Sequence, residues 1–160
     1  MYSTDEPVIL ENFLRHCAKG SYNNIKVLRF IPNFILQTGS SINKSKDNKP
    51  ADPNNKPTGI SHGKFLEHRK IKKGTLFTIN NPDQADRCGC QFFFLLSEDH
   101  LDSLGNGDYT AIGEIIDGFE LIEKLASEIT TVSHPSGKPT GKWKQSNWLE
   151  SIEIHNNPLV

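Results

Sequence analysis

The sequence predicts one mainly β domain, built as a barrel or a sandwich. Most apolar residues fall in short runs that alternate with polar residues or end at turn residues, as strands do. Only two segments carry the spacing of helices, and a chain of 160 residues has room for one sizeable core. We therefore expect residues 1–160 to form a single domain. Its strands are expected over residues 25–30, 34–38, 75–79, 92–96, 109–116 and 149–154.

The first predicted helix covers residues 8–17. Its apolar residues recur at four-residue spacing, which is typical of an amphipathic helix: Ile9, Phe13 and Cys17, and again Leu10 and Leu14. Pro7 stands in the first turn, where proline is tolerated, and Gly20 is a plausible stop. A second helix is expected over residues 119–126, after the turn at Asp117-Gly118.

Composition excludes several classes of function. The 18 basic and 19 acidic residues give a net charge of −1, so the chain lacks the basic field that direct nucleic-acid binding needs. No apolar run approaches the roughly 20 residues that cross a bilayer, and the first residues do not resemble a secretion signal. Three cysteines, an odd number, fit free thiols in a reducing compartment. We expect a nuclear or cytoplasmic protein that does not bind or span a membrane.

The segment 43–57 is composed mainly of Asn, Lys, Asp and Pro. It has too little apolar surface to offset the entropy of ordering, so a loop insertion is expected there. A basic tether for a partner is the alternative. A second exposed loop is expected over residues 133–144, which are rich in Pro, Gly and Lys.

No metal site or cofactor is predicted. Cys88 and Cys90 form a Cys-x-Cys pair rather than the Cys-x-x-Cys clamp of zinc sites, although His16, His62 and His68 are present elsewhere. A cysteine nucleophile would need a local signature that the sequence lacks. Cys17 lies on the apolar helical face, so it is interpreted as a small buried hydrophobe.

Two strand segments carry residues that indicate a binding face. Arg29 is a permanent charge within an apolar run, where it needs either an ion-pair partner or a water-filled cleft. Gln91 and Phe93 share one face of the strand over residues 92–96, while Phe92 and Phe94 share the other. A mixed polar and aromatic face is typical of a ligand groove, and an exposed barrel face would also fit.

The order of motifs resembles the cyclophilin type of peptidyl-prolyl cis-trans isomerase. The motifs are ENFLRHC followed by Tyr22-Asn23, then LRFIPNFILQTG, GCQFFF, HLD and YTAIGEIIDG, and the similarity extends over about residues 6–158. The resemblance implies an antiparallel eight-stranded barrel closed by two helices. It also implies an enzyme that accelerates rotation about X-Pro bonds in peptides and proteins, without a cofactor.

Residue by residue, the resemblance implies a complete site. Arg29 would be the catalytic arginine, with Gln37 helping to position the prolyl amide. The proline pocket would be formed by Phe34, Ile35, Phe93 and Leu101, and the flanking peptide would be held by Asn80 and Gln91. His100 and Tyr109 would also lie at the substrate, where the best-known members have a tryptophan and a histidine.

His100, Tyr109, the Gln37-Thr38-Gly39 motif and the carboxy-terminal IEIHNNP are similar to the subgroup called peptidyl-prolyl isomerase-like protein three. That subgroup is found with the spliceosome. The likeness implies spliceosomal protein partners and weak binding of cyclosporin.

The chain also departs from the family pattern. Val27-Leu28 replaces the usual Phe-His, and Ile79 replaces a small residue beside the groove, which its branched side chain is expected to narrow. The family places two strands before its first helix, where this chain has a few residues, so the barrel is expected without its N-terminal hairpin. Two explanations stay open: the sequence begins within the domain, or another chain completes a truncated domain. A catalytically weak or inactive module that binds peptides or proteins is therefore the alternative to the isomerase.

Overall fold

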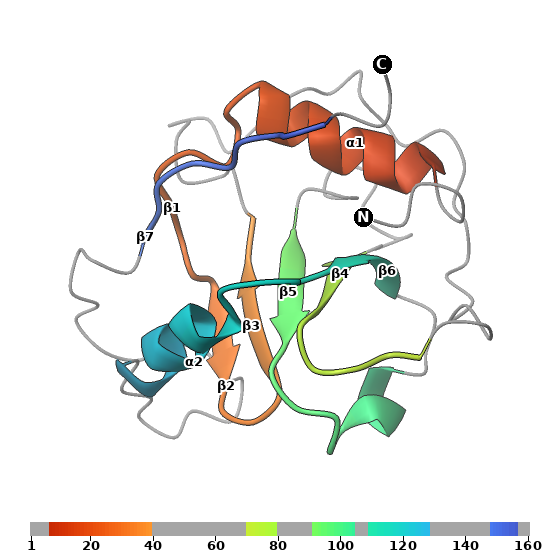
Figure 1. Ribbon diagram of the computed structural model, residues 1–160, viewed down its shortest axis with the longest axis vertical. Helices are drawn as coiled ribbons and strands as arrows, with labels where there is room; N and C mark the ends of the chain where they lie inside the picture. The colour runs from red at the N-terminus through yellow and green to blue at the C-terminus, as the bar shows by residue number, and fades with distance from the viewer. Residues whose placement is uncertain (1–6, 40–69, 80–90, 105–108, 129–147, 157–160) are drawn as a thin grey trace.

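The computed structural model describes residues 7–39, 70–79, 91–104, 109–128 and 148–156. These residues form a mainly β fold with two helices (Figure 1). The helices are α1 (Pro7–Ala18) and α2 (Phe119–Glu128), and Leu101–Leu104 form a short 3-10 helix, η2. The strands are β1 (Ile25–Lys26), β2 (Arg29–Ile31), β3 (Ile35–Thr38), β4 (Thr75–Ile79), β5 (Phe92–Leu95), β6 (Tyr109–Glu114) and β7 (Trp148–Leu149).

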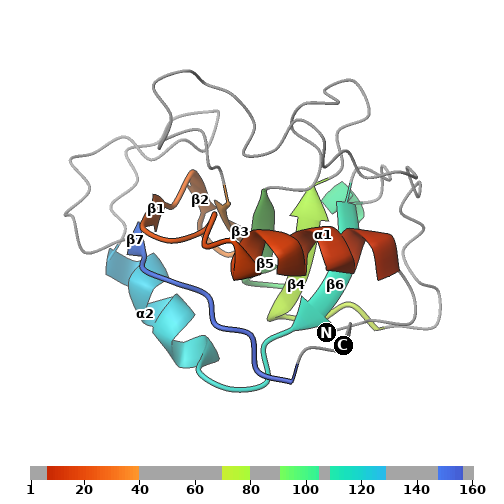
Figure 2. The same ribbon diagram turned by 90° about the horizontal axis from the view of Figure 1, so that it is seen from above.

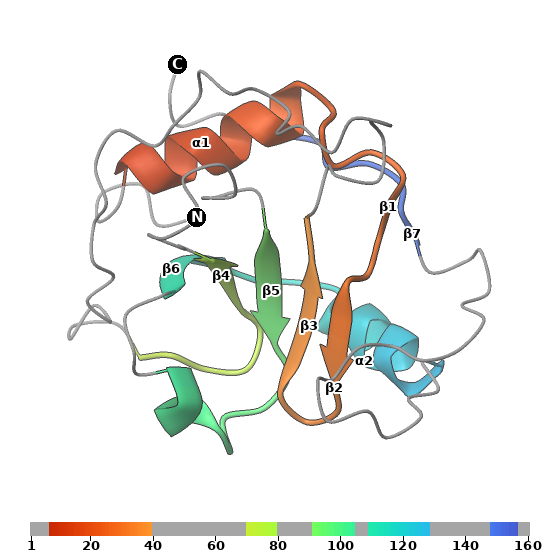
Figure 3. The ribbon, with the colours of Figure 1, turned by 180° about the vertical axis from the view of Figure 1, so that it is seen from behind.

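The strands form two antiparallel sheets. Five strands lie in the order β2-β3-β5-β4-β6, as seen from behind in Figure 3, and β1 pairs with β7 in a separate two-stranded sheet. The described strands number seven, and the five-stranded sheet is open. The expected mainly β antiparallel fold with two helices is confirmed, whereas the closed barrel of eight strands stays a prediction.

Both helices pack against one face of the five-stranded sheet, at different ends of it (Figure 2). The buried stripe of α1 contacts Leu76 of β4, Phe92 of β5 and Ile112 of β6. Leu125 of α2 packs near Phe30 and Leu36 at the other end. The main core lies between the helices and this face of the sheet. The opposite face carries a second, separate cluster, which includes Ile35, Phe77 and Phe93.

The helix predicted over residues 8–17 is confirmed, and so is the burial of Cys17, which is 4% exposed. The helix ends in a Schellman motif: the Ser21 N–H donates to the His16 carbonyl over 3.0 Å, and the Gly20 N–H donates to the Cys17 carbonyl over 2.9 Å. Gly20 has a φ of 64°, which explains why the helix stops there.

Two predicted strands differ from the observed ones by more than one or two residues at an end. The run over residues 25–30 is split into β1 and β2, because β1 pairs with β7 while β2 pairs with β3. The run over residues 149–154 forms a strand only at its first residue, in β7. Ile152 and Ile154 nevertheless pack against the main core, so the alternation there reflects burial rather than a ladder of hydrogen bonds.

No helix among the described residues is long and apolar enough to cross a membrane. The expected insertion over residues 43–57 and the loop over residues 133–144 lie outside the described residues. The single domain over residues 1–160 stays a prediction.

Candidate active site

Arg29, Gln37 and Phe93 lie side by side on three neighbouring strands. Arg29 of β2 stands opposite Gln37 of β3, and Gln37 stands opposite Phe93 of β5. Figure 3 shows these three strands next to one another. Residues that are directly opposite in a sheet project from the same face. The row therefore joins a cation, an amide and an aromatic ring on the face that the two helices leave uncovered.

Arg29 is half-buried, at the edge of the five-stranded sheet. Its Nε is buried and has no hydrogen-bond partner among the described residues. The backbone around it is held firmly, because the Leu28 N–H donates to the Gln37 carbonyl over 2.8 Å. A guanidinium with an unused donor on this face is equipped to bind an acceptor supplied by a ligand.

The residues of the predicted proline pocket belong to one apolar cluster on this face. Ile35 and Phe93 are buried within it, and Phe34, Leu101 and Tyr109 pack half-buried against it. The ring of Phe93 stacks on Phe77 with centroids 4.9 Å apart and meets Tyr109 edge-on at 5.3 Å. Phe93 is 1% exposed and lies at the floor of this cluster, called the pocket cluster below, while the half-buried Phe34, Leu101 and Tyr109 form its rim.

His100 joins the rim through Phe34. The two rings meet edge-on with centroids 5.5 Å apart, and the His100 side chain is exposed. The structure thus brings His100 to the same cluster as Leu101, its neighbour in the chain. An imidazole here offers polar nitrogens at the surface of an otherwise apolar rim.

A tight turn places Phe34. The Phe34 N–H donates to the Ile31 carbonyl over 3.1 Å, which closes a turn through Pro32 and Asn33. Asn33 has a φ of 55°, a left-handed conformation that asparagine tolerates better than most residues. The Phe34 carbonyl accepts from the Leu96 N–H over 2.8 Å, so this turn is fastened to the end of β5.

Gln37 and Gln91 are joined directly. Gln37 Nε2 donates to Gln91 Oε1 over 2.7 Å, and both side chains are partly buried. This bond fixes the orientation of the Gln37 amide beside Arg29. The predicted separation of Phe93 from Phe92 and Phe94 is confirmed by their different clusters. Gln91 is bonded to Gln37, which stands opposite Phe93, as expected if Gln91 and Phe93 share a face.

Ile79 is the residue that the sequence predicts to lie beside the groove. It stands opposite Tyr109 and packs half-buried against the pocket cluster. The Ile79 N–H donates to the Gln91 carbonyl over 3.1 Å. The backbone of Ile79 is therefore bonded to the residue whose side chain accepts a hydrogen bond from Gln37. Whether Ile79 narrows the groove stays a prediction.

Asn80 lies outside the described residues, as do Cys88, Cys90, His62 and His68. In the described part of the chain, no group of three or more His, Cys, Asp or Glu side chains is placed to hold a metal ion. Burial raises the pKa of the Cys17 thiol from its ordinary value of 9.0 to about 12, so Cys17 is a poor nucleophile at neutral pH.

Sequence reasoning missed Phe77, whose ring lies under Phe93. The alternation within residues 75–79 puts Phe77 on the same side as Ile79, which is the signal that was available. Ile71 also packs against the pocket cluster, and no pattern in its neighbourhood indicates this.

The chain is similar to known proteins over most of its length. The chain is 30% identical to "Peptidyl-prolyl cis-trans isomerase 10" of Caenorhabditis elegans over 168 residues, covering 100% of this chain and 89% of that protein. It is 31% identical to "Peptidyl-prolyl cis-trans isomerase-like 3" of Neurospora crassa over 162 residues, covering 96% and 87%.

A solved structure resembles the fold. The crystal structure of a Cryptosporidium parvum cyclophilin type peptidyl-prolyl cis-trans isomerase in the presence of the dipeptide Ala-Pro matches with a TM-score of 0.67 and 25% identity, covering 98% of this chain and 90% of that one. A family model described as "Cyclophilin type peptidyl-prolyl cis-trans isomerase/CLD" matches residues 1–147. The chain therefore belongs to the cyclophilin type of peptidyl-prolyl cis-trans isomerases.

Proposed function

We propose that this chain accelerates cis–trans exchange of X-Pro bonds in peptides and proteins on the sheet face that carries Arg29. The observation that carries the proposal is the row of Arg29, Gln37 and Phe93 on adjacent strands. In this row the hydrogen-bond donor Arg29 and the apolar ring of Phe93 each stand directly opposite the amide of Gln37. Proteins and peptides with accessible prolines are the expected substrates.

The chemistry requires little else. An X-Pro amide rotates slowly because its nitrogen lone pair is delocalised into the carbonyl, which gives a barrier of about 18–20 kcal/mol. A catalyst must favour the twisted amide over the planar one, which donors directed at the prolyl nitrogen achieve. No acid, base, nucleophile or metal takes part in this rotation.

The side chains divide the work as follows in this proposal. Arg29 donates to the prolyl nitrogen as it becomes pyramidal, and Gln37 orients the neighbouring carbonyl. The pyrrolidine ring contacts Phe34, Ile35, Phe93 and Leu101, with Tyr109 at the rim. Gln91 and Asn80 bind the flanking peptide backbone, so sequence preference beyond proline is expected to be modest.

The experiment that tests this proposal measures exchange by NMR on a short X-Pro peptide with wild type and Arg29→Ala. Loss of a donor to a transition state lowers rates by about 10²–10³-fold, so the variant is expected to leave exchange near its uncatalysed rate. Arg15→Ala is the matched control, since Arg15 is exposed on α1 and pairs there with Glu11. Unchanged exchange in folded Arg29→Ala would remove the proposal.

The second candidate is a peptide-binding module without catalysis, which the packing of Ile79 against the pocket cluster favours. The same NMR experiment separates the two functions. A silent binder shifts the peptide resonances without exchange between the cis and trans signals, whereas an isomerase produces that exchange.

The cellular setting is proposed on the relatives. Several of them carry the name "Peptidyl-prolyl cis-trans isomerase-like 3", the subgroup that the motifs of this chain resemble. On that resemblance we propose a role with spliceosomal proteins and a nuclear or cytoplasmic location. Imaging of the tagged chain, and its co-purification with spliceosomal proteins, tests this.

Weak cyclosporin binding is also proposed, because His100 offers a smaller ring than tryptophan. Calorimetry of wild type beside His100→Trp measures the affinity for cyclosporin.

A further inference from the structure

A rigid turn lies next to the pocket cluster, at the start of β4. Thr75 Oγ1 donates to the Lys72 carbonyl over 2.7 Å and accepts from the Lys72 N–H over 3.2 Å. Gly74, with a φ of 86°, donates to the Leu95 carbonyl over 2.8 Å and accepts from the Ile115 N–H over 3.0 Å. The turn is thereby fixed between β5 and β6, and Ile71 before it packs against the pocket cluster.

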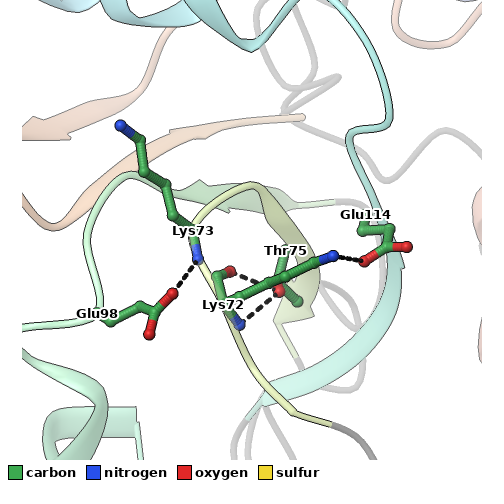
Figure 4. A network of polar contacts seen from close by, with 5 residues as sticks. All are labelled: Lys72, Lys73, Thr75, Glu98 and Glu114. Atoms are coloured by element: carbon green, nitrogen blue, oxygen red, sulfur yellow. Dashed lines mark hydrogen bonds and ion pairs between the residues drawn. The ribbon is translucent and has the colours of Figure 1, made fainter.

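Glu98 contacts this turn through a backbone group. Its Oε1 accepts from the Lys73 N–H over 3.2 Å (Figure 4). The Lys73 side chain extends away from Glu98 instead, pairs with Glu123 of α2, and lies 4.8 Å from the centroid of the Phe119 ring. The contact therefore depends on the Glu98 carboxylate and a main-chain donor, and it needs no lysine ammonium.

Glu98 lies in the short segment that carries the rim of the pocket. The segment begins with the Leu96 N–H bonded to Phe34, and the Leu101 N–H donates to the Glu98 carbonyl over 3.3 Å. His100 and Leu101 at its end contact Phe34 and the pocket cluster. The Glu98 side chain thus ties the middle of this segment to a turn that cannot easily move.

We propose that Glu98 is a positioning residue for the proline slot. Its carboxylate holds the segment 96–101 against the turn at 72–75, so that His100 and Leu101 stand at the distance from Phe34 that a pyrrolidine ring requires. The role rests on the proposed function of this face, since Glu98 itself touches no substrate. It adds a specific residue that neither the sequence nor the family likeness singles out.

The test compares Glu98→Ala with Glu98→Gln, which keeps an oxygen acceptor and removes the charge. For a short X-Pro peptide, Glu98→Ala is expected to raise KM about threefold to tenfold with kcat little changed, because an exposed hydrogen bond contributes modestly. Glu98→Gln is expected to stay within about twofold of wild type. Lys73→Ala is the matched control, because it removes the ion pair with Glu123 and keeps the N–H that Glu98 uses.

A structural readout accompanies the kinetics. In peptide-free protein, the ring resonances of Phe34 and His100 are expected to shift in Glu98→Ala and to remain in place in Glu98→Gln. An unchanged KM in Glu98→Ala overturns the proposal, and so does an equal rise in Glu98→Gln or Lys73→Ala. If wild type shows no exchange, the proposed function fails by itself, and the peptide Kd replaces KM in the same comparison.

Discussion

The Gln37 side chain donates to Gln91 Oε1 over 2.7 Å, joining the centre of β3 to the residue that precedes β5. Gln37 also stands directly opposite Arg29. One amide therefore lies between the proposed catalytic cation and a second amide. An interaction that orients Gln37 sets which of its atoms faces a substrate next to Arg29, and this makes Gln91 a sensitive place to probe the site.

Replacing Gln91 by leucine is expected to lower kcat/KM for an X-Pro peptide about threefold to tenfold, because the Gln37 amide loses its acceptor. Gln91→Glu retains an oxygen acceptor and is expected to lose less. NMR of the Gln37 side-chain amide in peptide-free protein reports the orientation directly. A kcat/KM unchanged in Gln91→Leu would contradict this prediction.

Because the Cys17 thiol is buried, the free energy of unfolding is expected to depend on pH in the alkaline range. The thiol ionises near pH 9.0 in the unfolded chain and only near pH 12 in the folded one, because burial disfavours the thiolate. Between these values the unfolded state binds fewer protons, so the free energy of unfolding falls as pH rises, by up to about 1.4 kcal/mol per unit. Below pH 9.0 this contribution is complete.

Urea unfolding at a series of pH values from neutral to about 10.5 measures the effect, with Cys17→Ala as the reference that lacks the titrating group. The difference in unfolding free energy between wild type and variant is expected to shrink above pH 9.0. Parallel curves for the two proteins across this range would show that the buried thiol does not control the dependence.

Asn33 carries the left-handed position of the turn before Phe34, with a φ of 55°. Asn33→Val is expected to destabilise the protein by about 1–3 kcal/mol, since a β-branched residue is strained in this conformation. Asn33→Gly is the control and is expected to change stability by less than about 1 kcal/mol. Denaturant unfolding measures both, and equal stability of Val and Gly variants would argue against a strained backbone here.

Local patterns were enough to predict the elements that bury a continuous stripe. The apolar spacing of Phe13 and Cys17 predicts α1, and the run that becomes β5 is apolar throughout because each face of this sheet carries an apolar cluster. In such elements, burial determines whether each position carries an apolar or a polar residue. Their partners need not be known for the elements to be recognised.

Features that depend on pairing could not be predicted in the same way. No glycine or proline marks the break at Val27 and Leu28, between β1 and β2, because the break follows from two different partner strands. Ile152 alternates as in a strand, yet it contributes packing alone. Strand boundaries of this kind are set by the tertiary structure rather than by local preference.

In the candidate site too, some residues could be predicted from local patterns, while others depend on the tertiary structure. Arg29 and Phe93 are indicated by the local pattern of charge and alternation and by motifs that resemble a family, whereas the place of Phe77 under Phe93 depends on a register with a shift between Leu76 and Phe77. The contact of Glu98 with the Lys73 N–H joins residues 25 apart in sequence. Such contacts arise only when the turn geometry is fixed, and no periodicity encodes them.

Ile79 offers the most direct test of how far this chain departs from an efficient isomerase. Its half-buried side chain packs against the pocket cluster opposite Tyr109, and its branched Cβ leaves it few rotamers with which to move aside. Ile79→Ala is expected to cost about 1–2 kcal/mol of stability, less than a fully buried isoleucine, and to raise kcat/KM for an X-Pro peptide. Ile79→Val, which removes one methylene, should change both quantities in the same directions by smaller amounts. If the folded alanine variant is slower than wild type, Ile79 forms part of the wall that holds the ring, and the idea that it narrows the groove is wrong.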